Sequence, residues 1–397
     1  MTDTKKLFEP LDEMETPDRW PSITQLVEGR AKRRRPARIG VALVVTVLVT
    51  VGLTVGLFAT FGPGHRGKQP VAQSPSPLPV NDLQLGAMRQ LDIGLDEGSV
   101  SSMADGFGSA WVIGQFVQPG VNQLRRFDPK NGSVEATFSL PVDGGSEWGG
   151  DGLVVGDSYV WASAWNSATV FRIDPADDTV TKFPLDGRVV SQLTIDQVTG
   201  ELWATVAGNG DAGSTLVELN PTDGSVLSST AYTTDYSGEL LPLQGTVWLQ
   251  SRHVRHGGVF GGFLQQILPG STPDVQTGGS FAFPTTDGRW IWTPASSNNE
   301  AMNLASGIAQ VDAMGQVVNA WDVGSVDYDV ATGQDGGVWF LGAKGLERLN
   351  PTTGEVQSWQ SSPDGETPIL IVVGSDGVWV GTYEGHLYFR PFEGLST

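Results

Sequence analysis

The chain contains no cysteine among its 397 residues. This absence excludes a disulfide framework, a thiolate metal site, a cysteine nucleophile and a lipid-modified cysteine anchor. Histidine is scarce, with four residues, and basic residues are outnumbered by acidic ones, 24 to 44. A domain of this composition has to be stabilised by its apolar core and by the closure of its fold.

Positive charge is particularly sparse in the C-terminal part. Residues 81–397 carry 13 Lys and Arg against 37 Asp and Glu, a balance of −24, whereas residues 1–38 carry nine basic and seven acidic residues. A domain with this excess of negative charge repels the phosphate backbone, so we exclude nucleic acid as its partner.

Charge of either sign is missing from residues 39–61, a run of 23 residues. A helix of that length, at about 1.5 Å per residue, measures roughly 35 Å and can cross a bilayer. The basic cluster at positions 32–38 precedes this run, which places the N-terminus in the cytoplasm and the C-terminus outside. The run exceeds the roughly 7–15 apolar residues of a cleaved signal peptide, so we interpret it as an uncleaved signal anchor.

These features divide the chain into a cytoplasmic tail (1–38), a transmembrane helix (39–61), a Pro-rich linker (62–80) and an extracytoplasmic domain (81–397). The linker contains Pro70, Pro75, Pro77 and Pro79 between small polar residues, which predicts a semi-extended spacer. The sequence allows three interpretations of the tail: an insertion and topology signal, a membrane-surface helix, or a docking segment for a cytosolic partner. We therefore expect a single-pass protein of the cell membrane.

The fourth region, residues 81–397, contains a repeat of 40–50 residues, a period typical of β-propeller blades. Seven segments place a Trp after an apolar residue, with Trp-to-Trp spacings of 50, 42, 45, 44, 47 and 40 residues. No sustained helical periodicity occurs in residues 81–397, which excludes a helical solenoid. We expect the seven side chains to fill the wedges between neighbouring sheets. They are Trp111, Trp161, Trp203, Trp248, Trp292, Trp339 and Trp379.

Each unit reads as four strands, with a recurring turn before the fourth. The turn is Asn-Pro-Thr-Thr-Gly at 350–354, Asp-Pro-Lys-Asn-Gly at 128–132 and Asn-Pro-Thr-Asp-Gly at 220–224, with variants that begin at Asp174 and Asp312. The Asn or Asp side chain caps such a turn, Pro presets φ, and Gly adopts a positive φ.

The last unit lacks a fourth strand after the predicted third strand at 386–390. Residues 87–93 precede the first unit and have the pattern of an outer strand, so we expect them to complete the seventh blade. The sequence thus predicts an all-β, seven-bladed propeller closed by an N-terminal strand and preceded by one transmembrane helix.

The segment Thr169-Val170-Phe171-Arg172-Ile173-Asp174-Pro175, followed by Val-Thr-Lys-Phe-Pro-Leu at 180–185, resembles the repeat of streptogramin B (virginiamycin B) lyase-type propellers and of related bacterial repeat propellers. The resemblance covers roughly residues 86–397 and implies a seven-bladed magnesium enzyme that uses Glu and His. Repeats of that family tend to carry Trp-Phe-Thr-Glu in the second strand. The positions of the Glu hold other residues here, namely Gly114, Ala164, Val206, Ser251, Ala295, Gly342 and Thr382.

The resemblance therefore transfers no catalytic residue, and we predict no metal and no cofactor. His253, His256 and His386 do not have the spacing of a recognised metal site. Three functions stay open. The first is a binding module for a ligand or protein of the cell envelope, and the second is a metal-dependent lyase-like or hydrolytic enzyme with a degenerate site. The third is signalling through the 38-residue tail, although the tail contains no catalytic domain.

The candidate binding residues belong to predicted loops at one end of the blades. Residues 252–262 are predicted to be a long, Gly-rich loop between the second and third strands of the fourth unit, and they form a compact basic cluster in an acidic domain. Such a cluster suits an anionic ligand or an acidic patch, unless it is simply solvated surface. Aromatic residues on neighbouring loops suit a glycan or peptide. The candidates are Arg252, His253, Arg255, His256, Trp148, Trp165, Asn166, Asn298, Tyr383 and Glu384.

Overall fold

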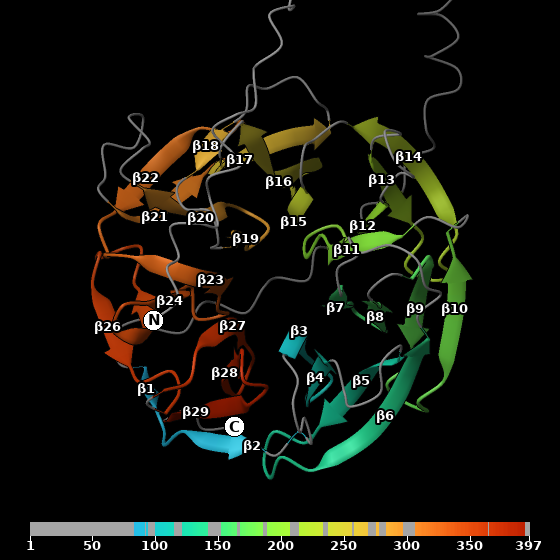
Figure 1. Cartoon of the computed structure of the whole chain (residues 1–397), viewed down its shortest axis with the longest axis horizontal. Coiled ribbons are helices and arrows are strands. Elements are labelled where there is room, and N and C mark those ends of the chain that lie inside the picture. Colours follow the sequence, from blue (N-terminus) through green and yellow to red (C-terminus); the bar gives the residue numbers. More distant parts are fainter. Residues whose placement is uncertain are drawn as a thin grey trace, which may run out of the picture. The chain divides into compact units, whose positions relative to one another are not determined.

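The computed structural model describes residues 83–91, 93, 100–114, 121–141, 152–164, 167–185, 189–206, 214–232, 237–255, 258–268, 275–277, 283–296, 306–363 and 365–393. In these ranges the chain forms β-strands, which make seven sheets arranged in a ring (Figure 1). The predicted seven-bladed β-propeller is confirmed. No helix in these ranges is long and apolar enough to span a membrane, and the predicted anchor at 39–61 lies outside them.

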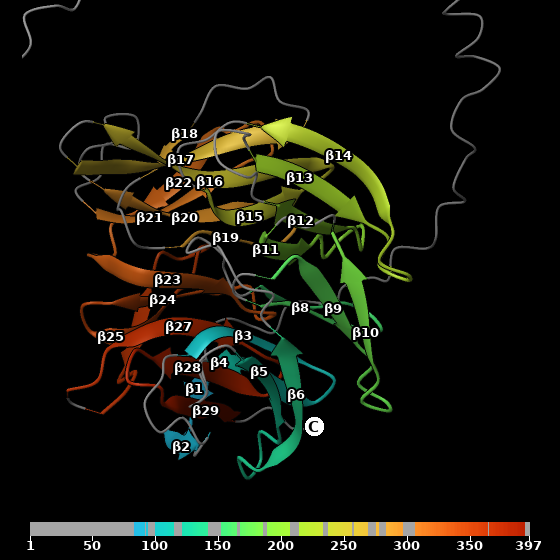
Figure 2. The same ribbon diagram turned by 45° about the vertical axis from the view of Figure 1, so that its right-hand side comes forward.

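Six blades are four-stranded antiparallel sheets whose strands pair in chain order. Blade 1 contains β3 (Val100–Gly106), β4 (Ser109–Gly114), β5 (Val121–Phe127) and β6 (Val134–Pro141); blade 2 contains β7 (Leu153–Val155), β8 (Val160–Ser163), β9 (Thr169–Ile173) and β10 (Val180–Pro184). Blade 3 contains β11 (Val190–Ile195), β12 (Leu202–Val206), β13 (Ser214–Leu219) and β14 (Val226–Tyr232); blade 4 contains β15 (Ser237–Leu243), β16 (Thr246–Arg255), β17 (Gly258–Leu268) and β18 (Val275–Thr277). Blade 5 contains β19 (Thr285–Thr286), β20 (Ile291–Ser296), β21 (Ser306–Val311) and β22 (Val317–Trp321); blade 6 contains β23 (Val326–Thr332), β24 (Val338–Gly342), β25 (Gly345–Leu349) and β26 (Val356–Trp359). The first strand of each blade lies nearest the centre of the ring and the fourth lies at its rim (Figure 2).

The seventh blade joins the two ends of the propeller. It contains β27 (Pro368–Val373), β28 (Gly377–Thr382) and β29 (Leu387–Glu393), with β1 (Gln84–Leu85) and β2 (Arg89–Leu91) both paired to β29. The prediction that residues 87–93 complete this blade is confirmed, and β1 extends the closure beyond it. Pairing of β29 with the N-terminal strands covers an edge that the sheet would otherwise expose.

The seven repeat Trp side chains form the core between blades, as predicted. Their exposed fractions lie between 0 and 6%. Trp111 of blade 1 packs with Leu153 and Phe171 of blade 2, and Trp379 of blade 7 packs with Val100 of blade 1. Each Trp thus binds its own blade to the next, and truncation of such a buried ring to Ala typically costs about 3–5 kcal/mol.

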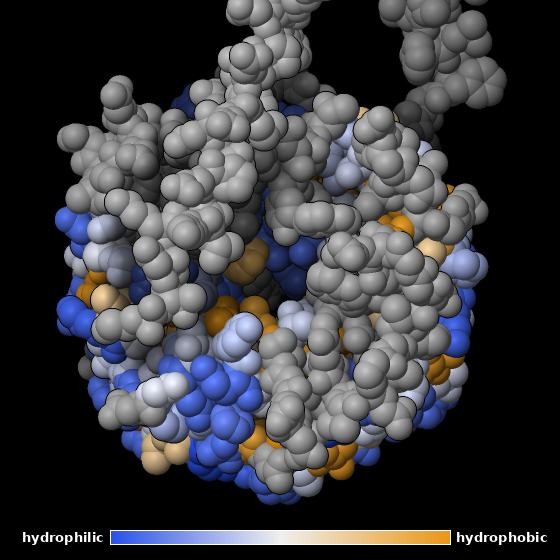
Figure 3. Space-filling model, in the orientation of Figure 1, coloured by the Kyte–Doolittle hydropathy of each residue, from blue (hydrophilic) through white to orange (hydrophobic). Residues whose placement is uncertain are grey.

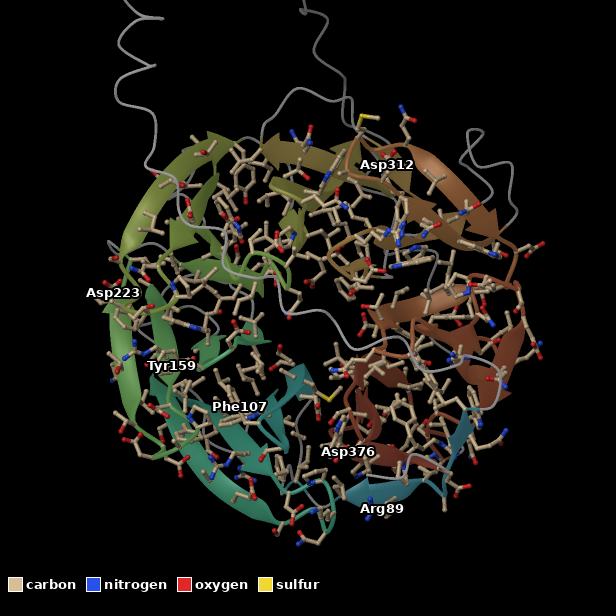
Figure 4. The ribbon with its side chains drawn as sticks, turned by 180° about the vertical axis from the view of Figure 1, so that it is seen from behind. Arg89, Phe107, Tyr159, Asp223, Asp312 and Asp376 are labelled. Carbon is tan, nitrogen blue, oxygen red and sulfur yellow. The ribbon has the colours of Figure 1, made fainter. Side chains whose placement is uncertain are left out.

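The predicted turns before the fourth strands are also confirmed. In blade 3, the side chain of Asn220 accepts a hydrogen bond from the amide of Thr222 at 2.9 Å, and the amide of Gly224 donates to the carbonyl of Asn220 at 2.8 Å. Gly224 has a φ of 69°, and Asp178 takes the same position in blade 2 with a φ of 60°. These turns lie with the turns between the first two strands on one face of the ring, the turn face (Figure 4).

Arginines connect three of these turns to the preceding blade. Arg126 of blade 1 donates to the carbonyl of Pro175 at 3.0 Å and to Asp178 Oδ1 at 2.8 Å, both in the turn of blade 2. Arg172 of blade 2 donates to a carbonyl in the turn of blade 3, and Arg89 of β2 donates to the carbonyl of Lys130 in blade 1 at 2.6 Å. Charge-assisted hydrogen bonds of this kind therefore join neighbouring blades at three places along the outer edge of the ring.

Blade 4 differs from the prediction of a loop at 252–262. Strands β16 and β17 stay paired through this segment, with Arg252 opposite Gly262 and Arg255 opposite Gly258. The prediction of a loop is wrong. The neighbouring residues of β16 and β17 fix the register of the two strands, and the backbone groups of this glycine-rich segment then pair with each other. Only residues 256 and 257 separate the two strands.

Candidate functional site

A central cavity of about 750 Å³ runs between the blades and is lined by the first strands of all seven. On the face that carries the connections between the second and third strands, here called the loop face, the surface is hollowed near its centre (Figure 3). A cavity of this volume is within the range that holds small organic ligands.

The charged side chains that line this cavity are all acidic in the part of the chain that the structure describes. Asp105 and Asp157 lie near the turn face, at the end of β3 and in the β7–β8 turn. Glu239 comes from β15 and Asp329 from β23. The cavity therefore carries a negative potential with no lining Lys, Arg or His among the described residues to offset it.

Asp329 connects two blades through its carboxylate. Its Oδ2 accepts a hydrogen bond from the amide of Ile371 on β27 at 2.9 Å, and its Oδ1 accepts one from its neighbour Val330, also at 2.9 Å. The amide of Ile371 belongs to the inner strand of blade 7, which has no further strand beside it. Asp329 thus satisfies a donor that faces the middle of the ring.

Burial shifts both inner carboxyl groups toward neutral pH. Desolvation raises the pKa of Asp329 to about 8; the amide of Ile371 opposes this rise, and the negative charge of Glu239 adds to it. Desolvation alone raises the pKa of Glu239 to about 7. Two like charges close together in a poorly solvated place cannot both ionise easily, so this pair retains protons near pH 7.

Phe283 brings an aromatic ring to the same level of the cavity. Its amide donates to the carbonyl of Tyr328 at 2.8 Å, and its backbone pairs with Asp329 in a short parallel bridge between blades 5 and 6. Leu240 and Ile371 also line the cavity here. Phe283 therefore adds an aromatic residue to the cavity lining beside Asp329, whereas Leu240 and Ile371 belong to the cores between blades.

A second cluster lies on blade 7 at the loop face and is here called the blade-7 rim (Glu366, Thr367, Tyr383, Glu384, His386 and Tyr388). Glu366 Oε1 faces His386 Nδ1 at 3.0 Å and accepts a hydrogen bond from Tyr388 Oη at 2.7 Å. The other oxygen, Oε2, is buried and has no hydrogen-bond donor among the described residues. Burial and the charge of Glu366 raise the pKa of Tyr388, which keeps its hydroxyl protonated as a donor.

Hydrogen bonds hold the two connections of this rim together. The amide of Tyr383 donates to the carbonyl of Thr367 at 2.9 Å, and the amide of Thr367 donates to Glu384 Oε2 at 2.9 Å. The Tyr383 ring is 68% exposed above these bonds. The rim thus presents a solvent-accessible aromatic side chain on a fixed backbone.

The structure places three further predicted site residues on a strand. Arg252, His253 and Arg255 belong to β16, where the backbone alone is described, and His256 follows the end of that strand outside the described residues. The remaining predicted site residues, Trp148, Trp165, Asn166 and Asn298, also lie outside the described residues.

Sequence reasoning did not select Glu239, Asp329 or Glu366. A sequence signal exists for Glu239, which is an acid in a first strand that otherwise contains apolar or small residues, whereas Asp329 shares its strand with Asp327 and does not stand out. No sequence signal places Glu366 against His386, since the two belong to different connections of the blade. Within the described residues, no group of three or more His, Asp or Glu is arranged to hold a metal ion.

No family model and no curated protein sequence matches the chain. Among solved structures, the chain is similar to a catalytically inactive histidine-to-alanine variant of virginiamycin B lyase from Staphylococcus aureus with quinupristin. The identity is 12%, the match covers 78% of this chain and 99% of that one, and the TM-score is 0.56. It is also similar to the Pan2 WD40 domain of Neurospora crassa, at 14% identity over 81% of this chain and 99% of that one, with a TM-score of 0.56. At these identities the likeness shows the fold, and it agrees with the resemblance to lyase-type propellers found in the repeats.

Proposed function

We propose that this chain is a membrane-anchored binding module, with the propeller outside the cytoplasm and the loop face turned toward a ligand or protein of the cell envelope. The uncharged run at 39–61, after the basic cluster at 32–38, supports the anchor and its orientation. The propeller fold itself serves many unrelated activities, so the binding role has to be argued from the site.

The blade-7 rim is the observation that carries the proposed function. Exposed aromatic side chains with polar groups beside them are common contacts for peptides and glycans, and here the backbone below Tyr383 is fixed by hydrogen bonds. A ligand that meets a fixed side chain loses less conformational entropy on binding than one that meets a mobile loop.

The extended β16–β17 hairpin supplies a second contact surface in this proposal. Both Arg252 and Arg255 lie in the last part of β16, and Arg255 lies beyond the point where the shorter second strands of the other blades end. We propose that they, with His253 and His256, meet an anionic part of the ligand or an acidic patch of a partner protein. The proposal extends to Trp148, Trp165, Asn166 and Asn298, which lie outside the described residues.

The test uses the purified full chain on arrays of envelope polysaccharides, peptidoglycan fragments and peptides. A ligand found there is then titrated against Tyr383→Ala, the double variant Arg252→Ala/Arg255→Ala, and Met314→Ala as a matched control. Met314 is 64% exposed on the turn face. We expect at least a tenfold loss of affinity in the first two variants and none in the control. Equal affinity of all three variants would show that the ligand binds somewhere other than the loop face.

The alternative function, a metal-dependent lyase-like enzyme, receives support from one observation. A carboxylate that faces an imidazole nitrogen, as Glu366 faces His386, is an arrangement suited to general base catalysis. The Glu of the lyase-type repeats is absent from all seven second strands, however, so we expect no ring opening of a streptogramin B such as quinupristin. Ring opening that needs Mg²⁺ and is lost in Glu366→Gln would select the alternative.

A further inference from the structure

We propose that the central cavity is a second binding site, specific for an organic ammonium ion held between the carboxylates of Glu239 and Asp329. The inference goes beyond the loop-face function, because the cavity and the blade-7 rim are built from different residues. The charge of the cavity wall, the unused hydrogen-bonding capacity of the two acids and the aromatic residue in the lining support this assignment.

The charge of the wall selects a cation. Four acids line the described part of the cavity and no basic residue does, so an anion has no counter-charge there. Asp105 and Asp157, the other two acids, lie toward the turn face. Asp105 is engaged with the Nε1 of Trp379 at 3.3 Å, across the seam between blades 7 and 1. Glu239 and Asp329 are therefore the acids available for a ligand deep in the ring.

The hydrogen bonding of these two acids is incomplete. Glu239 is half-buried on the cavity wall, and none of the residues that the structure describes donates a hydrogen bond to its carboxyl group. Asp329 receives one amide at each oxygen, while a carboxylate has about four acceptor positions. An ammonium group brings three donors together with the opposite charge, so it can fill these free acceptor positions.

The surrounding wall favours an organic cation over a metal ion. Calcium takes about six to eight oxygen ligands, whereas the two acids here share the cavity lining with residues such as Phe283. A carbon skeleton buries its surface against such residues, and an aromatic ring such as Phe283 attracts a cation at its face. The volume of about 750 Å³ leaves room for a ligand much larger than a hydrated ion.

Proton release provides a signature of this site. Burial raises the pKa of Asp329 to about 8 and that of Glu239 to about 7, so the empty pair carries protons at pH 7. An entering ammonium ion favours the ionised form of both acids, and the proton leaves to the solvent. Affinity should therefore rise as the pH increases from 6 to 8.

The experiment titrates the full chain with benzylammonium and with the diammonium ion of 1,4-diaminobutane by calorimetry at pH 6, 7 and 8. Each pH is measured in two buffers of different ionisation enthalpy. We expect saturable binding of at least one probe, net proton release at pH 7, and an affinity at least threefold higher at pH 8 than at pH 6. Benzyl alcohol and benzoate, which lack the positive charge, should not bind.

Variants assign the binding to the two acids. We expect Glu239→Gln and Asp329→Asn each to reduce affinity at least tenfold, and Phe283→Leu to reduce it several-fold. Glu355→Gln removes an equal charge from the surface and should leave affinity unchanged. Tyr383→Ala should also leave it unchanged, which separates this site from the loop-face function.

Three outcomes would overturn the proposal. The first is that neither probe binds saturably to the wild-type chain. The second is that Glu239→Gln and Asp329→Asn both keep the wild-type affinity. The third is that 1 equivalent of Ca²⁺ displaces the bound probe. The pH dependence and proton release are measured on the wild-type chain, so they decide the question even where a variant does not fold.

Discussion

Asp329 shows at the scale of a single residue how burial makes the stability of the propeller depend on pH. The folded chain holds this proton up to about pH 8, whereas a carboxyl group at the ordinary value of 3.8 releases it in the unfolded chain. Between these values the folded state binds more protons than the unfolded state. The free energy of unfolding therefore falls as the pH rises through this window, and this contribution levels off above pH 8.

We predict that Asp329→Asn removes part of this pH-dependent decrease in the free energy of unfolding. The amide oxygen of Asn still accepts the hydrogen bond from Ile371, and Asn has no charge to desolvate. The NH2 group of Asn cannot accept the second bond, from Val330, so at pH 5 the variant should be the less stable of the two. Between pH 5 and pH 8.5 its free energy of unfolding relative to the wild-type chain should rise by about 1–3 kcal/mol. Thermal unfolding of the full chain across pH 5–9 measures this. A wild-type chain that gains stability relative to the variant as the pH rises would contradict it, and Glu355→Gln serves as the surface control.

A second residue-scale prediction concerns Gly224, which needs both its conformation and its lack of a side chain. Its φ is 69°, and a Cβ atom added there would lie 2.5 Å from the Phe183 ring of blade 2. We predict that Gly224→Ala destabilises the propeller by about 2–4 kcal/mol through strain and overpacking together. Thermal melting of the purified chain measures the loss.

Gly200 supplies the matched control for this substitution. It has a φ of 73°, but an added Cβ would meet nothing within 4 Å. Gly200→Ala therefore reports the cost of the backbone conformation alone, about 1 kcal/mol. Equal losses in the two variants would show that the contact between the turn of blade 3 and Phe183 contributes nothing.

The N-terminal strands matter at the scale of an element, because they complete a sheet made by the other end of the chain. Leu83, Leu91 and Ile93 are buried, at 7, 5 and 3% exposure. We predict that deletion of residues 83–93 lowers the free energy of unfolding by at least about 3 kcal/mol, since each buried aliphatic side chain contributes about 1.5–3 kcal/mol. The drop in melting temperature of the full chain checks this.

Two comparisons isolate the role of the strand pairing. Deletion of residues 70–80 shortens the chain by the same length and should leave the melting temperature unchanged. A synthetic peptide of residues 83–93, added to the chain that lacks these residues, should restore part of the stability by pairing with β29. An unaltered melting temperature after the first deletion would refute a stabilising role for β1 and β2.

For the molecule as a whole, we predict that the tail is cytoplasmic and the propeller external. Protease added to intact cells or spheroplasts should degrade residues 81–397 or release them, and should leave an epitope on residues 1–38 intact until the membrane is opened. The physical reason is the basic cluster at 32–38, which favours the cytoplasmic side. Cleavage of the tail with protection of the propeller would reverse the proposed topology.

Most of the architecture was predictable because its signals are local and repeated. Each repeat Trp marks one second strand, and Asn220 with Gly224 identifies a turn from five consecutive residues. Even the closure followed from a count of strands, since the last unit was one strand short. These features depend on patterns that a single blade already contains.

The candidate sites were harder to predict because they join residues from different blades or connections. Glu239 and Asp329 are 90 positions apart and meet only because the ring brings their two inner strands to one cavity. Residues 252–262 were predicted as a loop, since their glycines carry no strand preference, whereas the paired backbone extends β16 and β17. The acidic site and the extended hairpin both depend on how strands pair and pack in the folded ring, which no local sequence pattern shows.

The pairing of β2 with β29 also determines when the propeller can be finished during synthesis. Arg89 and Phe389 are partners that are 300 residues apart. At about 5–20 residues per second, a ribosome needs roughly 15–60 s to translate that interval. During this time β1 and β2 have no partner strand, and blades 1–6 can form before the ring is joined. The nascent chain is therefore an open arc with two unpaired edges until the last few dozen residues emerge, and premature termination anywhere before β29 leaves it open.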